Sequence, residues 1–329
     1  MRLYLATSLL CSLAAGLSLP SRVVYQFPVN PTWIENIAVR KNGNLLVTLN
    51  TSPDIVQIAK PWGPSPTPEL VHRFSSLDAV LGITETTADT FVVVGGKFTG
   101  VGASIPGTFA AWQVSLTDKE PKATKIVDIP EAPFLNGAVA LPWDKNIVLV
   151  AESAQGKLYR VNVKAKTYDV VLEGADLEVA PGASAPFGIN GVHIRKDFLY
   201  FTNSSLKKVF RVRLEQSGAI AANATIELFG SADVEFFDDF TLDSKGNVWV
   251  VTNFDNKLVV INPDGKSSVV AGSATELTVA GGTAVAFGRT VKDKDILYAV
   301  TGGAYAKPVN GTITEPGKIV AFDTRSYCL

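Results

Sequence analysis

The sequence predicts an all-β fold, a six-bladed β-propeller in which each blade contains four strands. Two observations indicate this fold. A short hairpin of alternating apolar residues recurs six times along the 329 residues, and its period of roughly 44–54 residues is typical of propeller blades. Turn-forming Gly, Asn, Asp and Pro separate the β-rich runs, and no amphipathic helical segment of useful length interrupts them.

Each repeat contains a small or polar residue, a short alternating segment, a turn and a β-rich run. The six hairpins formed in this way pair residues 35–39 with 45–48, 81–84 with 91–94, 136–139 with 147–150, 190–192 with 198–201, 238–242 with 248–251, and 283–287 with 296–300. A third strand follows in every repeat, at residues 55–58, 109–114, 158–161, 209–212, 258–261 and 319–322. Outer strands follow five repeats, at residues 69–74, 123–129, 168–172, 224–229 and 267–270.

No outer strand follows the sixth repeat, so an N-terminal strand is expected to complete it. Residues 22–27 have the composition of a strand and precede the first repeat. Pairing them beside residues 319–322 would close the ring and remove an exposed sheet edge. A β-sandwich is the alternative, but it does not explain six matched hairpins. Residues 19–329 are therefore expected to form one propeller domain without a linker.

Residues 1–18 have the pattern of a secretory signal peptide. Arg2 precedes an apolar run, and Gly16 and Ser18 are small residues before a cleavage site near Leu19. The run is shorter than the ~20 residues of a membrane span, so we expect a protein that is secreted or in the secretory pathway, with no membrane span in the mature chain. Four sequons agree with this and are the candidate glycosylation sites: Asn50, Asn203, Asn223 and Asn310.

Composition narrows the classes of partner. Cleavage would remove Cys11 and leave only Cys328, so no internal disulfide is expected and Cys328 is a free thiol or an intermolecular link. The chain has 30 basic and 31 acidic side chains, and loss of Arg2 would leave 29 and 31, a net charge of −2. No basic footprint for nucleic acid is present. We expect a monomer that binds small, apolar organic substrates.

Polar residues recur where the first strand of each repeat begins, at Glu35, Gly82, Asn136, Asn190, Asp238 and Thr283. In a propeller these positions converge on the central axis. The oxygen atoms of two carboxylates and two amides suit Ca²⁺, whereas zinc and copper favour Cys and His. Asn and Asp that only cap turns are the alternative, but four such residues at one phase of the repeat favour an axial cluster.

Aromatic residues also recur just before these first strands. Trp33, Phe134, Phe187, Phe236 and Phe237 occupy this position, and Trp62 and Tyr305 lie in longer loops. Packing between blades explains any one of them equally well. Together they predict an aromatic-lined cavity for a sizeable organic ligand.

The quartet Glu35, Asn136, Asn190 and Asp238 resembles the metal-binding residues of the senescence-marker-protein/gluconolactonase-like propellers. Residues 238–250 are similar to a Pro-Asp-Gly…Asp…Gly-x-Leu/Val-Trp-Val segment of that family, and residues 284–299 resemble its last blade. The likeness covers nearly the whole mature chain. The resemblance implies a Ca²⁺ site at the quartet, although the sequence leaves open whether the metal role is retained. The lactonases and the fluorophosphate hydrolase of this family have histidines at the pocket. This chain contains only His72, on an outer strand, and His193, three residues into a first strand.

Residues 33–40, the leader and the sequons resemble a fungal branch of that family, which contains secreted hetero-Diels–Alderases of tropolone–sesquiterpenoid biosynthesis. The resemblance implies an enzyme of secondary metabolism that joins a tropolone quinone methide to a humulene-type terpene. Asp238, Glu35 and Asn190 would orient the polar end of the substrates. The substrate-binding candidates are Trp33, Phe134, Phe187, Phe236, Phe237, Asp239 and His193. A Ca²⁺-dependent lactonase or esterase, with Asp238 or Asp239 as base or nucleophile, and a non-catalytic ligand-binding propeller remain alternatives.

Overall fold

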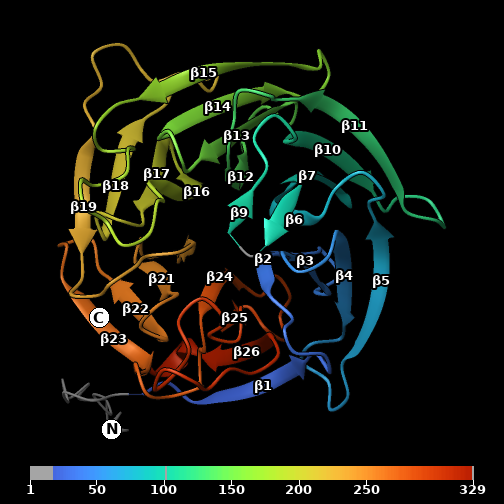
Figure 1. Ribbon diagram of the computed structural model, residues 1–329, viewed down its shortest axis with the longest axis vertical. Coiled ribbons are helices and arrows are strands. Elements are labelled where there is room, and N and C mark those ends of the chain that lie inside the picture. The colour runs from blue at the N-terminus through green and yellow to red at the C-terminus, as the bar shows by residue number, and fades with distance from the viewer. Residues whose placement is uncertain (1–17, 101, 328–329) are drawn as a thin grey trace, which may run out of the picture.

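The computed structural model describes residues 18–100 and 102–327. Six four-stranded antiparallel sheets surround a central axis (Figure 1), which confirms the predicted propeller. Residues 1–17 of the expected leader and Cys328 lie outside the described residues. Within the described ranges the only helix is η1 (Thr324–Ser326), a single 3₁₀ turn, and none has the length and apolar character needed to cross a membrane.

The blades follow one another in chain order. Blade 1 contains β2 (Ile34–Val39), β3 (Leu45–Leu49), β4 (Asp54–Ala59) and β5 (Thr67–Arg73). Blade 2 contains β6 (Ala79–Thr87), β7 (Thr90–Gly96), β10 (Ala110–Ser115) and β11 (Lys122–Asp128). Blade 3 contains β12 (Leu135–Ala140), β13 (Ile147–Glu152), β14 (Lys157–Asn162) and β15 (Thr167–Glu173). Between β7 and β10 a small hairpin, β8 (Phe98–Gly100) and β9 (Ala103–Ser104), forms a separate two-stranded sheet that the repeat did not predict.

The second half of the chain repeats this pattern. Blade 4 contains β16 (Ile189–Arg195), β17 (Phe198–Asn203), β18 (Lys208–Arg213) and β19 (Glu227–Ser231). Blade 5 contains β20 (Phe240–Leu242), β21 (Val248–Thr252), β22 (Lys257–Ile261) and β23 (Ser267–Gly272). Blade 6 contains β24 (Gly282–Phe287), β25 (Ile296–Thr301), β26 (Lys318–Asp323) and β1 (Ser21–Gln26).

The N-terminal strand closes the ring, as predicted. β1 runs antiparallel to β26, from the pair Ser21–Phe322 to the pair Gln26–Lys318, and the two strands lie side by side in Figure 1. Val24 is 6% exposed and packs in the apolar cluster between blades 6 and 1, whereas its neighbour Val23 is 52% exposed. One apolar cluster of this kind fills each space between neighbouring blades.

The innermost strands are irregular at the same position in most blades. In blades 1, 2, 3, 4 and 6 the register between the first and second strand shifts near the start of the first strand. The shifts enclose Glu35 in blade 1, Asn136 in blade 3 and Asn190 in blade 4. An extra residue in one strand bends it and re-aims a side chain. Because of these β-bulges, the side chains of Glu35, Asn136 and Asn190 depart from the regular alternation of the strand and point to the axis.

Threonine hydroxyls satisfy backbone groups that the bulges leave out of the ladder. Thr48 accepts a hydrogen bond from the backbone N–H of Asn36 and donates to the carbonyl of Leu81 in the next blade. Thr202 accepts from the N–H of Gly191 and donates to the carbonyl of Asp238. Because each hydroxyl also reaches the following blade, the bulges are satisfied by the same contacts that join neighbouring blades.

Glycines allow the first strands to approach closely at the axis. A Cβ on Gly82 would lie 2.2 Å from the carbonyl oxygen of Asn136 in the next blade, and a Cβ on Gly137 would lie 2.5 Å from that of Asn190. No side chain fits at such distances, so these two positions require glycine.

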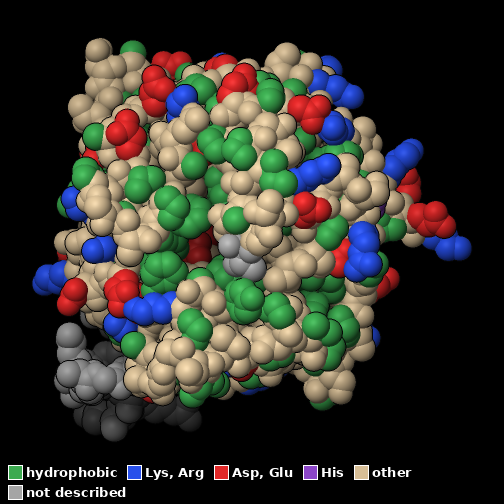
Figure 2. All heavy atoms as spheres, viewed as in Figure 1, with side chains coloured by type: hydrophobic (Ala, Val, Ile, Leu, Met, Phe, Trp, Pro, Cys, Tyr) green, Lys and Arg blue, Asp and Glu red, His purple; other side chains and the backbone are tan. Residues whose placement is uncertain are grey.

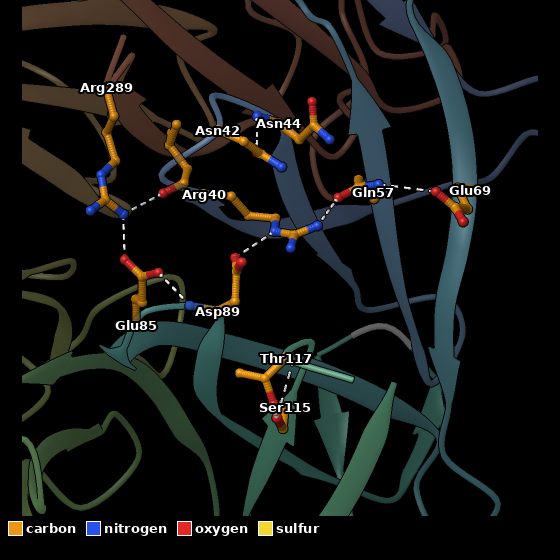
Figure 3. A network of polar contacts seen from close by, with 11 residues as sticks. Arg40, Asn42, Asn44, Gln57, Glu69, Glu85, Asp89, Ser115, Thr117 and Arg289 are labelled. Atoms are coloured by element: carbon orange, nitrogen blue, oxygen red, sulfur yellow. Dashed lines mark hydrogen bonds and ion pairs between the residues drawn. The ribbon is translucent and has the colours of Figure 1, made fainter. Parts of the chain in front are cut away.

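The two ends of the propeller differ in chemistry. The end at which the first strands begin carries a hollow at the axis with an acidic floor and apolar side chains around it (Figure 2). At the opposite end a polar network joins three blades (Figure 3). Arg40 pairs with Asp89 at 2.8 Å and donates to Gln57, and Arg289 pairs with Glu85. The network therefore ties blades 6, 1 and 2 together.

Candidate functional site

A cavity of about 440 Å³ opens on the axis at the end where the first strands begin. This volume lies within the roughly 300–1,000 Å³ of ordinary small-molecule sites. The residues lining it are Trp33, Glu35, Asn50, Gly102, Ala103, Phe134, Asn136, Pro186, Phe187, Asn190, Phe236, Asp238, Asn253, Phe254, Tyr305 and Ala306. Polar side chains gather on one part of this lining and aromatic rings on another.

The four polar residues expected at the axis all line this cavity. Glu35, Asn136 and Asn190 are carried by the bulged strands β2, β12 and β16, and Asp238 lies two residues before β20. All four are nearly buried, with at most 8% exposure. Asn190 Nδ2 donates to Asp238 Oδ1 at 3.0 Å, so that blades 4 and 5 are joined directly in the floor.

A second set of polar side chains supports the floor from the ends of the second strands. Ser153 accepts a hydrogen bond from Asn136, and Ser204 accepts one from Asn190. Asn253 Nδ2 donates to Asp238 Oδ2 at 3.0 Å. Asn50 hydrogen-bonds Glu35 in the same way. All four residues lie at the same position of the repeat, directly after the second strand of their blade. Their role was not predicted, although the phase itself is visible in the sequence.

Burial changes the protonation of the two floor carboxyls. Burial raises the pKa of Glu35 to about 7, against hydrogen bonds from Trp33 and Asn50 and with a further increase from Asp239. Burial and the neighbouring Glu35 also raise the pKa of Asp238 well above its ordinary value, against amide hydrogen bonds from Asn253 and Asn190. Two carboxyls in one apolar site cannot both ionise easily without a cation. Near neutral pH the floor can therefore hold a proton.

An arc of aromatic rings forms the side of the cavity next to blades 3, 4 and 5. The ring centroids of Phe134 and Phe187 are 4.9 Å apart, those of Phe187 and Phe236 are 6.1 Å apart, and those of Phe236 and Phe254 are 4.7 Å apart. Rings in such contact hold one another in place. Trp33 lies on the blade 1 side, and its indole Nε1 donates to Glu35 Oε2 at 2.6 Å.

Three predicted substrate-binding residues are not among those that line the cavity. Phe237 is fully buried in the apolar cluster between blades 4 and 5, with its side chain turned away from that of Phe236. Asp239 is buried and accepts hydrogen bonds from Asn36 Nδ2 at 2.9 Å and, when the imidazole carries the proton, from His193 Nε2 at 3.2 Å. His193 also packs on Phe240, so these residues form a second polar group around the axis, outside the cavity lining.

Two unexpected features complete the lining. Phe254, just after β21, belongs to the aromatic arc. Gly102 and Ala103 reach the cavity from the hairpin β8–β9, which lies near the axis in Figure 1. Of the two aromatic loop residues, Tyr305 lines the cavity, whereas Trp62 packs against Gly43 elsewhere. The hairpin β8–β9 is inserted in one blade only. Because the other repeats have no counterpart, the repeat pattern could not predict it.

Comparison with known proteins decides the family. The chain is 33% identical to "Putative hetero-Diels-Alderase asR5" of Sarocladium schorii, over 95% of this chain and 86% of that protein. It is 34% identical to a "Putative hetero-Diels-Alderase" of a Phoma species, over 88% of each chain. Residues 144–302 match the SMP-30/gluconolactonase/LRE-like region. The chain belongs to the SMP-30/gluconolactonase-like propellers, in the branch of these hetero-Diels–Alderases.

A solved structure has the same fold at low sequence identity. The chain aligns with regucalcin from Agrobacterium tumefaciens, a calcium-binding protein, with a TM-score of 0.64 and 14% identity, over 94% of this chain and 95% of that one. Because of the low identity, this similarity concerns the fold alone.

The donors in this floor fit a hard cation. The side-chain oxygens of Asn50, Asn190 and Asn253 are buried in the cavity lining and accept no hydrogen bond. A buried acceptor without a partner costs about 1–3 kcal/mol, so three in one cavity indicate a bound water, ligand or cation. Across the described part of the chain, no three His, Cys, Asp or Glu side chains group to hold a metal. A cation at Glu35 and Asp238 would therefore depend on amide oxygens such as those of Asn136 and Asn190, a donor set that Ca²⁺ accepts.

The four sequons of this SMP-30-like chain differ in accessibility. Asn50 lines the cavity, and Asn203 is fully buried and donates to the carbonyls of Asp176 and Glu178. Asn223 and Asn310 are exposed in turns. A glycan on Asn203 would replace two buried hydrogen bonds of the folded protein.

Proposed function

We propose that the chain is a hetero-Diels–Alderase that joins a tropolone quinone methide to a humulene-type terpene. The observation that carries this proposal is a single cavity in which an arc of phenylalanine rings faces a polar floor. The two relatives named hetero-Diels–Alderase, aligned over most of the chain, support the reaction class. The resemblance of residues 33–40 to the fungal branch supports the choice of substrates.

The reaction needs no nucleophile from the protein. In the cycloaddition the terpene alkene adds to the O=C–C=C unit of the quinone methide. One C–O bond and one C–C bond form from π electrons, and no group leaves. The main requirement is that two apolar partners meet in one orientation. Holding reactants in near-attack geometry can contribute about 7–11 kcal/mol to lowering a barrier. On this proposal Phe134, Phe187, Phe236 and Phe254 bind the terpene beside the quinone methide.

The floor would act on the oxygen of the quinone methide. A protonated Glu35 or Asp238 donates a hydrogen bond to that oxygen, which lowers the energy of the acceptor orbitals of the diene and stabilises charge that develops during bond formation. Asn190 holds Asp238 in place through its amide. If Ca²⁺ is held by Glu35, Asn136, Asn190 and Asp238, it supplies Lewis acidity to the same oxygen.

A Ca²⁺-dependent lactonase or esterase is the second candidate. The unpartnered amide oxygens of Asn50, Asn190 and Asn253 favour it, because they suit a metal that polarises an ester carbonyl. Against it, the described cavity lining contains no histidine to serve as a general base.

One pair of assays distinguishes the two candidates. Purified protein is incubated with a quinone-methide precursor and humulene, and separately with simple lactones and aryl esters. We expect an enantioenriched cycloadduct that exceeds the racemic background reaction, and no ester hydrolysis. Ca²⁺-dependent hydrolysis that disappears in Asp238→Ala, without cycloadduct formation, would overturn the proposal in favour of the hydrolase.

A further inference from the structure

A polar groove of about 250 Å³ lies beside the cavity on the same face. It is lined by loop residues 182–185 together with Ser205, Lys207, Glu235 and Phe236. The loop that forms one side of the groove continues into the cavity, because Pro186 and Phe187 follow directly and line the cavity. The groove and the cavity are therefore neighbours along one loop.

Among the described residues, Phe236 is the one that lines both spaces. It is 5% exposed, and its ring is held between Phe187 on the blade 4 side and Phe254 on the blade 5 side. The preceding residue is anchored as well, since Glu235 pairs with Lys307 and its N–H donates to Asp255 at 2.8 Å. The ring thus packs between two other rings at the border of the apolar cavity and the polar groove.

We infer that Phe236 is a specificity-determining residue that limits the size of the terpene accepted by the cavity, because its ring closes the cavity off from the neighbouring groove. The inference rests on the proposed terpene substrate. A terpene that fills the cavity stops at the ring, and a longer one must leave part of its chain in water. Removing the ring would connect the two spaces and let a longer chain with a polar end extend toward Ser184 and Ser205.

The test measures binding without the reaction. Farnesol and geranylgeraniol, which differ by one isoprene unit and share a terminal hydroxyl, are titrated into the full-length protein by calorimetry. We expect the wild type to bind farnesol at least about tenfold more tightly, since the additional isoprene unit of the longer alcohol meets the Phe236 ring and displaces carbon atoms that farnesol buries against the aromatic arc. In Phe236→Ala the preference should disappear or reverse.

Two further variants distinguish a connection between the cavity and the groove from a simple increase in cavity volume. Phe134→Ala removes an equally large ring that lines the cavity but not the groove, so both affinities should fall while the preference for farnesol remains. Ser184 is exposed in the groove, and Phe236→Ala combined with Ser184→Phe should refill the groove and restore the preference. If Phe236→Ala does not fold, as judged by circular dichroism, Phe236→Val should reduce the preference in the same direction.

An unchanged preference in a folded Phe236 variant, or an equal loss of preference in Phe134→Ala, would overturn the inference. Failure of the wild type to bind either alcohol would also overturn it, because the substrate class would then be wrong. The expected binding pattern without any cycloadduct formation would instead contradict only the proposed reaction.

Discussion

The indole Nε1 of Trp33 donates a hydrogen bond of 2.6 Å to Glu35 Oε2, and this bond joins the apolar wall of the cavity to its acidic floor. Both residues lie at the start of blade 1, one before the bulge and one within it. The orientation of the carboxyl therefore depends on the indole as well as on the backbone.

We expect Trp33→Phe to lower kcat by up to about tenfold and to reduce enantioselectivity. The variant retains an aromatic wall but loses the hydrogen bond to the Glu35 carboxyl, and a hydrogen bond of this kind contributes about 0.5–1.5 kcal/mol. Trp112→Phe is the matched control, because the buried Nε1 of Trp112 has no partner. Unchanged enantioselectivity in Trp33→Phe would show that Glu35 does not orient the substrate.

We expect Ca²⁺ to raise the melting temperature and a chelator to lower it. A ligand that binds only the folded protein stabilises it by about 2.7 kcal/mol at a concentration 100 times its Kd. Asp238→Asn should abolish this response, whereas Asp264→Asn, at an exposed turn, should retain it. A melting temperature that does not respond to either reagent would show that the floor has no calcium site.

We expect Val24→Ala to lower the free energy of unfolding by about 2 kcal/mol, because it leaves a cavity in the cluster that seals blade 6 against blade 1. Val23→Ala, on the same strand but exposed to solvent, should change it by less than about 0.5 kcal/mol. Urea denaturation measures both values. Equal effects would mean that β1 does not contribute to closure through its buried face.

We expect Asp89→Asn to cost about 1 kcal/mol of stability by breaking the ion pair with Arg40 between blades 1 and 2. The backbone φ of Asp89 is 57°, a conformation that asparagine tolerates, so the substitution tests the charge alone. The matched control is Asp169→Asn, which breaks a more exposed ion pair with Arg160 inside blade 3 and should cost less. The difference should shrink in high salt.

If the chain passes through a secretory pathway, we expect glycans on Asn223 and Asn310 and none on Asn203. The first two side chains are exposed, and the third donates two buried hydrogen bonds. Mass spectrometry of protein from a eukaryotic secretory host, before and after glycosidase treatment, checks each site. A stable, fully glycosylated Asn203 would contradict the hydrogen bonds described for it.

The sequence predicted the blades because each hairpin repeats the same alternation of apolar residues at one spacing. It also predicted that Glu35, Asn136, Asn190 and Asp238 share a cavity, since equal positions in a repeat converge on the axis. Asn253, which hydrogen-bonds Asp238, follows a second strand. This position differs from the one that the repeat predicts at the axis, which is the start of each first strand.

Other features do not follow the repeat, so the repeat pattern could not predict them. Phe236 and Phe237 both precede β20, where no ladder yet fixes which side chain faces the axis, so the sequence could not separate the wall residue from the core residue. The bulges pose a similar difficulty. One additional residue reverses the inside–outside alternation, and the repeat pattern alone does not reveal it.

The glycines at the axis have a consequence for directed evolution. Because the main chains of neighbouring first strands meet where Gly82 and Gly137 lack a side chain, the diameter of the ring is a property of the backbone. Libraries that randomise Phe134, Phe187 or Asn136 can therefore explore new selectivities on an unchanged frame. Libraries that include the two glycines would return mostly unfolded protein, and sequencing effort is better spent elsewhere.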